Sequence, residues 1–399
     1  MIYTDTDKMT PESKLILAIA KGVVCNQNNK AASLIKNNNI DWARLKEGLA
    51  YHGLVCFAYL SLKNQLSLLP QDLVSVLEAT YYYHLRHSAY LEHEFLNLYT
   101  AFEDKNILLI PIKGVALLED LYADFPIRPS TDIDVLVKEE DVGQGAKILE
   151  DLGFKKELEG LKESYWRKKQ YHLVFMKKER SSSSLIAELH WDLDYRRKRR
   201  QLLPNIFKRL REFTIQNKKV KLLSVEDTFF SLALHQRRFG NVLALRDACD
   251  IARLLNKYAL TFDWNYVLEA SQKAKVCATI FFSLCQINLL LEFKIPQFVW
   301  KKLNVPAWKR KLIQRFIKKN TFLGDQVRQT KNLYLKTHFL LYDSLWEPID
   351  YILNIPPEQF AKFYGLQCYT NKADLFYNNR MFYIPLKTIV SLFPKRIKR

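Results

Sequence analysis

Apolar residues recur at intervals of three and four along most of the chain, and one central segment departs from this spacing. Residues 11–105 follow the helical spacing almost throughout, with breaks at 26–30 and near Pro70. Helical spacing returns from Leu223 to the end of the chain. A face of apolar residues at this interval predicts amphipathic helices. The pattern therefore predicts two helical regions on either side of a different kind of structure.

The central segment alternates short apolar runs with helical stretches. Runs rich in Leu, Ile and Val predict strands at 107–114, 132–137, 171–178 and 185–193. Helices are predicted between them, at 114–125 and 139–152. We therefore expect an α+β fold in which a small mixed β-sheet is embedded between helical regions. The expected units are an N-terminal helical region at 1–105, an α/β core at 106–200 and a C-terminal helical region at 201–399.

Two aspartates, Asp132 and Asp134, interrupt the otherwise apolar run at 132–137. Successive side chains of a strand point to opposite faces, so both aspartates project to one face while Ile133 and Val135 project to the other. Two like charges this close raise each other's proton affinity unless a cation lies between them, and Mg²⁺ prefers oxygen ligands. The pair predicts a metal site. The alternative is the solvated polar face of an edge strand.

The neighbours of this pair favour the metal site. Lys113 and Gly114 end the preceding strand, Arg128 lies just before the pair, and Glu188 lies in a later strand. Two carboxylates from one strand and a third from its neighbour can hold two divalent ions about 4 Å apart, an arrangement that stabilises the entering and leaving oxygens of a phosphoryl displacement. This set favours nucleotidyl transfer. Glu188 is then both a ligand and the acceptor of the proton from the attacking hydroxyl.

The run from Ile110 to Phe154 resembles the core of bacterial proteins described as uncharacterised nucleotidyltransferases, which belong to the DNA polymerase β-type superfamily. A later "ELHW" at 188–191 and the stretch at 226–255 resemble two further signatures of that family. The positions that match the first signature are Lys113, Gly114, Tyr122, Arg128, Asp132, Asp134, Leu149, Gly153 and Phe154. The resemblance covers about residues 105–255 and implies a polymerase β-like sheet and metal-dependent transfer of a nucleoside monophosphate.

The resemblance also implies further residues at the site. His190, His235 and Asp250 would line the cleft and contact the donor or the acceptor. The alternatives are a hydrogen-bonded histidine at a strand end for His190, and a helix pair with an Arg246–Asp250 ion pair for the other two. One departure concerns phosphate binding, because most members of the superfamily have G-G or G-S at the start of the first helix, where backbone amides and a serine hydroxyl hold the triphosphate. Here Val115 follows Gly114, so Lys113 is expected to replace the hydroxyl as a point charge on the phosphates.

The expected reaction is transfer from a nucleoside triphosphate to an acceptor hydroxyl or phosphate, with two Mg²⁺ ions as cofactors and Mn²⁺ as the alternative. Members of the family are similar to proteins encoded beside ribosomally made peptides, including lasso peptides, so a peptide or a small molecule is expected as acceptor in preference to RNA. Two other functions stay open. One is glycosyl transfer from a nucleotide sugar to a phosphorylated peptide on the same fold, and the other is a non-catalytic RNA-binding or regulatory role.

Charge and cysteine content complete the picture. Lys and Arg outnumber Asp and Glu by 61 to 42, a formal charge of +19 that favours polyanionic partners. Five consecutive cations at 196–200 directly follow the strand that carries Glu188 and are candidates for steering a phosphate-rich substrate. The six cysteines form no metal-binding or disulfide pattern, and the apolar run at 276–291 is too short to span a membrane. We expect a cytoplasmic protein with no integral membrane segment.

Overall fold

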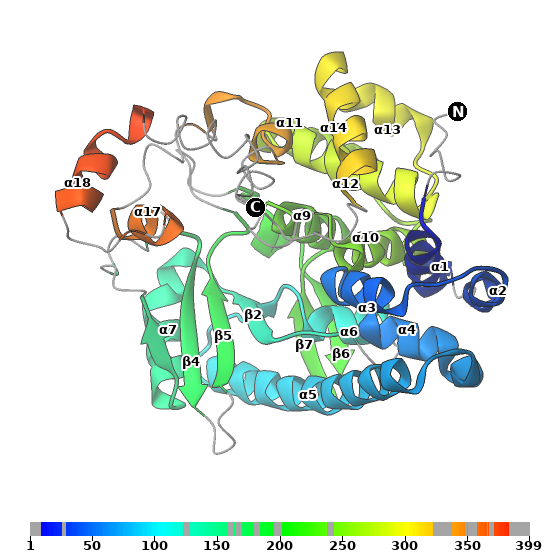
Figure 1. Ribbon diagram of the computed structural model, residues 1–399. Helices are drawn as coiled ribbons and strands as arrows, with labels where there is room; N and C mark the ends of the chain where they lie inside the picture. Colours follow the sequence, from blue (N-terminus) through cyan, green and yellow to red (C-terminus); the bar gives the residue numbers. More distant parts are fainter. Residues whose placement is uncertain are drawn as a thin grey trace.

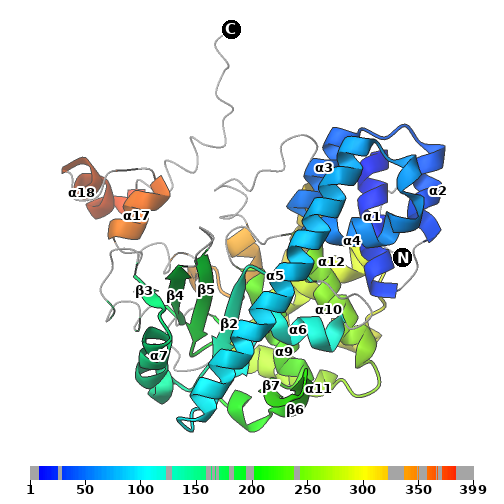
Figure 2. The same ribbon diagram turned by 90° about the horizontal axis from the view of Figure 1, so that it is seen from below.

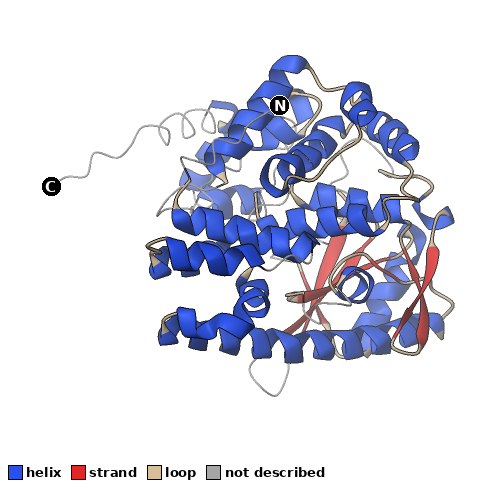
Figure 3. Cartoon of the chain, turned by 90° about the vertical axis from the view of Figure 1, so that its right-hand side faces the viewer, coloured by secondary structure: helices blue, strands red, loops and turns tan. Residues whose placement is uncertain are grey.

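The chain folds, in this computed structural model, around one mixed β-sheet enclosed by helices (Figures 1 and 3). The residues that the structure describes are 9–25, 29–122, 128–158, 163, 167, 170–178, 184–194, 202–237, 243–321, 337–347, 349, 357–364, 366 and 371–382.

The N-terminal region is helical, as the apolar spacing predicts. The helices are α1 (Pro11–Cys25), α2 (Asn29–Asn37), α3 (Trp42–Tyr51), α4 (Val55–Leu62), the 3-10 helix η2 (Lys63–Leu68) and α5 (Gln71–Glu103). Pro70 precedes the first turn of α5, where its fixed φ and missing N–H are tolerated. The buried side of α5 carries Leu77, Leu91, Phe95 and Phe102, which recur at helical intervals.

The central sheet has the strand order β1-β2-β5-β4-β3. Its strands are β1 (Ile110–Pro111), β2 (Asp132–Leu136), β3 (Lys155–Glu157), β4 (His172–Lys178) and β5 (Ser184–His190). Strands β2 and β5 are parallel, and the other neighbouring pairs are antiparallel. The helices α6 (Val115–Leu121) and α7 (Val142–Asp151), with the 3-10 turn η3 (Glu139–Asp141), connect the first strands. The expected mixed sheet is thus confirmed.

The two faces of the sheet have different surroundings. The face that carries Ile133 and Val135 packs against α5 and α7 in one apolar core. Gly145 of α7 lies so close to this core that a Cβ there would meet the ring of Phe102 at 3.0 Å and Leu189 at 3.4 Å. Figures 1 and 2 show α5 on this side of β2, whereas α9 (Val225–His235) and α10 (Leu245–Lys257) lie on the other side. The carboxylates of β2 therefore face the later helices.

The region after the sheet begins with a hairpin that the apolar spacing did not lead us to expect, formed by β6 (Arg211–Ile215) and β7 (Lys218–Leu222) after the turn η4 (Ile206–Lys208). Ser224 caps α9 by accepting a hydrogen bond from the amide of Asp227. The remaining helices are α11 (Trp264–Ala274), α12 (Cys277–Leu291), α13 (Gln297–Lys302), α14 (Ala307–Asn320), α17 (Pro357–Tyr364) and α18 (Asn371–Asn378). The helix α12 is buried along nearly its whole length and belongs to the core.

A second and larger apolar core joins the helices before the sheet to those after it. It contains Leu15 and Phe57 from the N-terminal helices together with Phe229, Leu254 and Phe282 from the later ones. Within the residues described above, no helix has the length and apolar character needed to cross a bilayer. In the same part of the chain, Cys56, Cys249, Cys277 and Cys285 are buried thiols.

Candidate active site

Three carboxylates converge where β2 and β5 run side by side. The parallel register places Asp134 opposite Glu188 and Asp132 opposite Ile186. Opposed residues of neighbouring strands point to the same face, so the side chains of Asp132, Asp134 and Glu188 gather on the face turned away from α5 and α7. One oxygen from each of these carboxylates lies within 4.8 Å of the others. Asp134 is 4% exposed, whereas Asp132 and Glu188 are partly exposed.

Two histidines lie on the same face as the carboxylates. The Nε2 atom of His190 lies 3.0 Å from Oδ1 of Asp134 and 3.1 Å from Oε2 of Glu188. The ring of His172 on β4 stacks on that of His190 with centroids 5.0 Å apart, and its Nε2 lies 3.9 Å from Glu188. A proton on Nε2 of His190 is therefore within reach of two carboxylates. His172 joins Glu188 and His190 in a second group whose ligand atoms lie within 4.8 Å of one another.

Lys113 and Gly114 border the carboxylates from the loop that follows β1. The Nζ atom of Lys113 lies 3.1 Å from Oδ2 of Asp134, and both side chains are buried. The cation balances a carboxylate that would otherwise be costly to bury beside two others. Gly114 has a φ of 58°, in the region that favours glycine, and a Cβ there would meet Oγ of Ser130 at 3.0 Å. Glycine thus allows the segment before β2 to approach the start of α6.

Ser130 is a site residue that the sequence did not reveal. Its hydroxyl lies beside Gly114 and is 3.3 Å from the carbonyl oxygen of Asp132, to which it donates. A hydroxyl is therefore present near the glycine although Val115 occupies the position after it. The superfamily pattern has glycine or serine after this glycine, whereas here a serine comes from the segment before β2. A serine two residues before the D-x-D pair was the available signal.

Arg128 and Asp250 form a buried pair. Nη2 of Arg128 donates to Oδ2 of Asp250 at 2.6 Å, and Nε donates to both carboxylate oxygens at 3.1 Å. The hydroxyl of Tyr122 donates to Oδ1 of the same carboxylate at 2.6 Å. Burial alone would lower the pKa of Arg128, but Asp250 raises it above its usual value. Asp250 therefore holds Arg128 charged and oriented, instead of forming the i,i+4 pair with Arg246 that the sequence allowed.

His235 on α9 and Arg246 on α10 approach the site, and both contact the carboxylate of Asp247. Nδ1 of His235 is 3.5 Å from Oδ2 of Asp247, and Nε of Arg246 is 3.3 Å from its Oδ1. Burial alone would raise the pKa of Asp247, but the charge of Arg246, the hydrogen bond from His235 and the charge of Arg128 lower it below its usual value. Asp247 escaped the sequence reasoning because His235 reaches it only through the packing of α9 against α10, whereas Arg246 is its neighbour in sequence.

These residues surround a cavity of about 270 Å³. Its lining consists of Lys113, Gly114, Arg128, Pro129, Ser130, Thr131, Asp132, Asp134, His235 and Arg246. The cavity thus brings together the carboxylates of Asp132 and Asp134, the cations of Lys113, Arg128 and Arg246, and the hydroxyls of Ser130 and Thr131. Among the residues that we expected at the site, Glu188 and His190 adjoin the cavity through Asp134, and Asp250 supports Arg128 from behind. The basic run at 196–200 lies outside the described residues.

The donor set of the carboxylate group fits a divalent cation. Asp132, Asp134 and Glu188 offer oxygen ligands within 4.8 Å of one another, and hard divalent ions prefer oxygen. Asp132 and Glu188 are partly exposed, which leaves a route by which an ion can enter. The group also faces a cavity lined by cations, as a site for an anionic substrate requires.

Comparison with known proteins identifies a family. The model of a family described as uncharacterised nucleotidyltransferase matches residues 38–292 of this 399-residue chain. The match therefore includes α3 to α5, the whole sheet and the helices that carry His235 and Asp247. No curated protein matches the chain, and no solved structure matches it. Since the family model covers more than half of the chain and all three carboxylates, the protein belongs to this nucleotidyltransferase family, whose members are transferases that use a nucleotide donor.

Proposed function

We propose that the protein is a magnesium-dependent nucleotidyltransferase that moves a nucleoside monophosphate from a nucleoside triphosphate to an acceptor hydroxyl or phosphate. The observation that carries this proposal is the gathering of three carboxylates beside a cavity lined by buried or partly buried cations. A binding module has no need to hold three anions together at a cost in repulsion. A transferase that binds divalent ions together with a triphosphate needs both features.

Asp132, Asp134 and Glu188 are the proposed metal ligands. Two Mg²⁺ ions suit this all-oxygen donor set, with Mn²⁺ as the alternative. When bound, the ions polarise the phosphate oxygens and stabilise the charge that develops on the entering and leaving oxygens. Lys113, 3.1 Å from Asp134, adds a fixed positive charge beside these ligands.

The donor phosphates are proposed to bind along the cavity. Arg128 is fixed by Asp250 and lines the cavity with its charge intact. Ser130 offers a hydroxyl in place of the serine absent after Gly114. Arg246 lines the far side of the cavity. Such preoriented donors stabilise negative charge without having to reorganise during the reaction.

In the proposed reaction, an oxygen of the acceptor attacks the α-phosphorus of the donor. The new P–O bond forms as the bond to the pyrophosphate leaving group breaks, and pyrophosphate carries away the charge. Glu188 accepts the proton of an attacking hydroxyl, and Nε2 of His190, 3.1 Å away, can exchange a proton with it. His235 lines the cavity from the side of the later helices and is placed to contact the donor.

We propose a peptide or a small molecule as the acceptor. The direct experiment incubates the purified protein with Mg²⁺, an extract of the source cell and each of the four nucleoside triphosphates, labelled on either the α or the γ phosphate. We expect the α label to enter a new product whose mass rises by one nucleoside monophosphate, while the γ label leaves in pyrophosphate. The matched control is Asp132→Asn, which should produce no such product.

Two outcomes would contradict the proposed reaction. Entry of the γ label into the product would indicate a kinase. Entry of a hexose from a labelled nucleotide sugar, with no entry of the α label, would instead select glycosyl transfer.

A further inference from the structure

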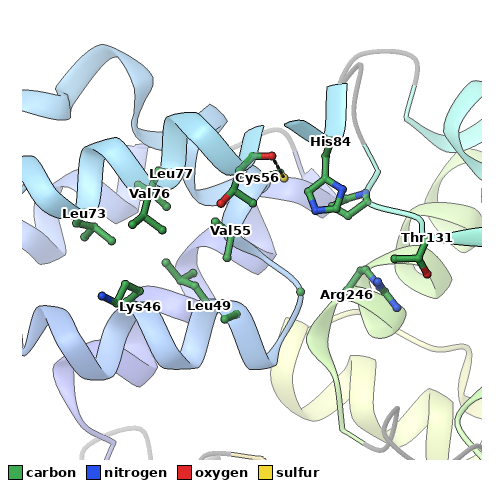
Figure 4. Close-up of a pocket in the computed structure, with 14 residues that line it drawn as sticks. Lys46, Leu49, Val55, Cys56, Leu73, Val76, Leu77, His84, Thr131 and Arg246 are labelled. Atoms are coloured by element: carbon green, nitrogen blue, oxygen red, sulfur yellow. Dashed lines mark hydrogen bonds between the residues drawn. The ribbon is translucent and has the colours of Figure 1, made fainter. Parts of the chain in front are cut away.

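A second cavity adjoins the catalytic one. It has a volume of about 370 Å³, within the range of small-molecule sites, and lies between α3, α4 and α5. Figure 4 shows Leu73, Val76 and Leu77 of α5 along one side and Leu49 with Lys46 of α3 along the other, while Thr131 and Arg246 stand at one end. The cavity therefore reaches from the N-terminal helices to the segment that carries the catalytic aspartates.

The walls of this cavity are mainly aliphatic. Val76 is 38% exposed on the open side, and Leu49, Leu73 and Leu77 are buried around it. Burial raises the pKa of the Cys56 thiol to about 12, so this wall residue stays neutral. Burial also lowers the pKa of His84, with a smaller contribution from His87 and Arg246, so its imidazole is neutral at pH 7. A ligand in this cavity would therefore contact mainly hydrocarbon side chains and few charged groups.

The cavity shares part of its lining with the catalytic one. Pro129, Thr131 and Arg246 line both. Arg246 is fixed at the junction, because its backbone amide donates to the carbonyl of His52 at 3.1 Å and a Cβ on Gly53 would meet its side chain at 3.3 Å. A ligand in the aliphatic cavity would thus present its polar end to Arg246 and to the aspartate strand beyond it.

We propose that this cavity binds an aliphatic hydrocarbon part of the acceptor and directs the adjoining hydroxyl or phosphate toward Asp132. The identity of the occupant as acceptor rests on the nucleotidyl transfer proposed above. The nucleobase is the competing occupant, and bases are held by stacking on aromatic rings and by hydrogen bonds to their edges. Among the described residues around this cavity, His84 alone carries an aromatic ring. The aliphatic lining therefore favours the acceptor.

The test measures calorimetrically the affinity of the full-length protein for ethyl, butyl and hexyl phosphate, without nucleotide. All three compounds carry the same phosphate group, so the ratio of their affinities measures the contribution of the hydrocarbon chain to binding. Burying two more methylenes should tighten binding on the order of tenfold from butyl to hexyl phosphate. Equal affinities across the series would overturn the proposal.

Val76→Asp and Ala79→Asp form a matched pair of variants on α5. Both positions are exposed and both changes add one carboxylate, but only Val76 lines the cavity. Val76→Asp should abolish the preference for hexyl over ethyl phosphate, because it places a charge in the aliphatic wall, while Ala79→Asp should keep that preference. Retention of the preference in Val76→Asp would contradict the assignment, provided that both variants melt as the parent does.

A kinetic arm identifies the occupant. Hexyl phosphate should inhibit transfer of the α label at saturating nucleoside triphosphate, and dilution of the acceptor extract should strengthen the inhibition. Relief of inhibition by added nucleoside triphosphate would assign the cavity to the donor and overturn the proposal. The calorimetric series contains no nucleotide, so the two proposals can fail separately. If the protein does not transfer nucleotides, the preference for hexyl phosphate can still be observed. If only that preference is absent, the cavity assignment fails and the proposed nucleotidyl transfer is unaffected.

Discussion

The ammonium group of Lys113 lies 3.1 Å from a carboxylate oxygen of Asp134, and both side chains are buried at the edge of the proposed metal site. In the absence of a divalent ion, this buried lysine balances part of the charge of Asp134. The pair therefore couples the stability of the fold to the occupancy of the site, because a lysine and a divalent cation compete for the same carboxylate.

Replacing Lys113 by Met tests this coupling. Without the charge of the lysine, buried Asp134 should destabilise the metal-free fold by about 3–5 kcal/mol. Mg²⁺ should then bind more tightly and restore part of the loss, so the rise in melting temperature on adding Mg²⁺ should be larger than in the parent. Lys138→Met, which removes an exposed lysine, is the control. A rise no larger than that of the parent would separate Lys113 from the metal site.

Variants of the buried Arg128–Asp250 pair distinguish a structural role of Arg128 from a role in donor binding. Asp250→Leu should lower stability by about 3–5 kcal/mol, because Arg128 keeps its charge with no partner. The double variant Arg128→Met, Asp250→Leu should recover much of this stability, since an apolar pair of similar volume can replace a buried ion pair. Chemical denaturation measures both variants.

In the double variant, the transferase activity should not recover together with the stability. The double variant still lacks the cation that lines the donor cavity. We expect it to fold well and to show a raised KM for the nucleoside triphosphate together with a reduced kcat. Recovery of activity along with stability would restrict Arg128 to a structural role.

Gly114→Ala tests the close approach of the two loops. The residue has a φ of 58°, and an added Cβ would meet Oγ of Ser130 at 3.0 Å. We expect a loss of about 1–3 kcal/mol, from the positive φ, and weaker binding of the nucleotide as Ser130 shifts. Gly143→Ala is the matched control, because a Cβ there meets nothing within 4 Å. An equal effect of the two changes on nucleotide affinity would contradict the role of Ser130.

Asp247 makes a pH-dependent contribution to stability. Burial alone would raise its pKa, but Arg246, His235 and Arg128 together hold the folded pKa below the unfolded value of about 3.9. The contribution is therefore fully present above about pH 4 and is lost as the pH falls toward the folded pKa. The stability difference between the parent and Asp247→Asn should shrink below pH 4 by up to about 1.4 kcal/mol per pH unit. Denaturation from pH 7 to pH 2 measures it, with exposed Asp151→Asn as control.

Much of the local structure could be predicted from the sequence. The alternation around Asp132 and Asp134 specified a strand and its two faces, and the register with β5 then brought Glu188 to the same face. The hairpin β6–β7 was missed although Val220 and Leu222 alternate with lysines. The many charged residues in these two short strands obscure the alternation of apolar residues in the sequence.

The contacts that complete the site were beyond the sequence pattern. Arg128 meets Asp250 across 122 positions of the chain, and this pairing depends on how α10 packs against the other helices. Ser130 approaches Gly114 only because the loop before β2 folds back onto the start of α6. Periodicity specifies the face of an element, whereas these contacts depend on the positions of whole elements in space.

The most direct test of nucleotidyl transfer at the carboxylate cluster is the rate of pyrophosphate release in Asp132→Asn, Asp134→Asn and Glu188→Gln, measured with Mg²⁺, nucleoside triphosphate and acceptor extract. Each variant keeps nearly the volume of the side chain and removes a charged ligand. We predict a fall of about a hundredfold or more in each, and near-parent rates in exposed Asp151→Asn. Near-parent release of pyrophosphate in Asp132→Asn and Asp134→Asn would contradict the assignment of this cluster as the catalytic centre.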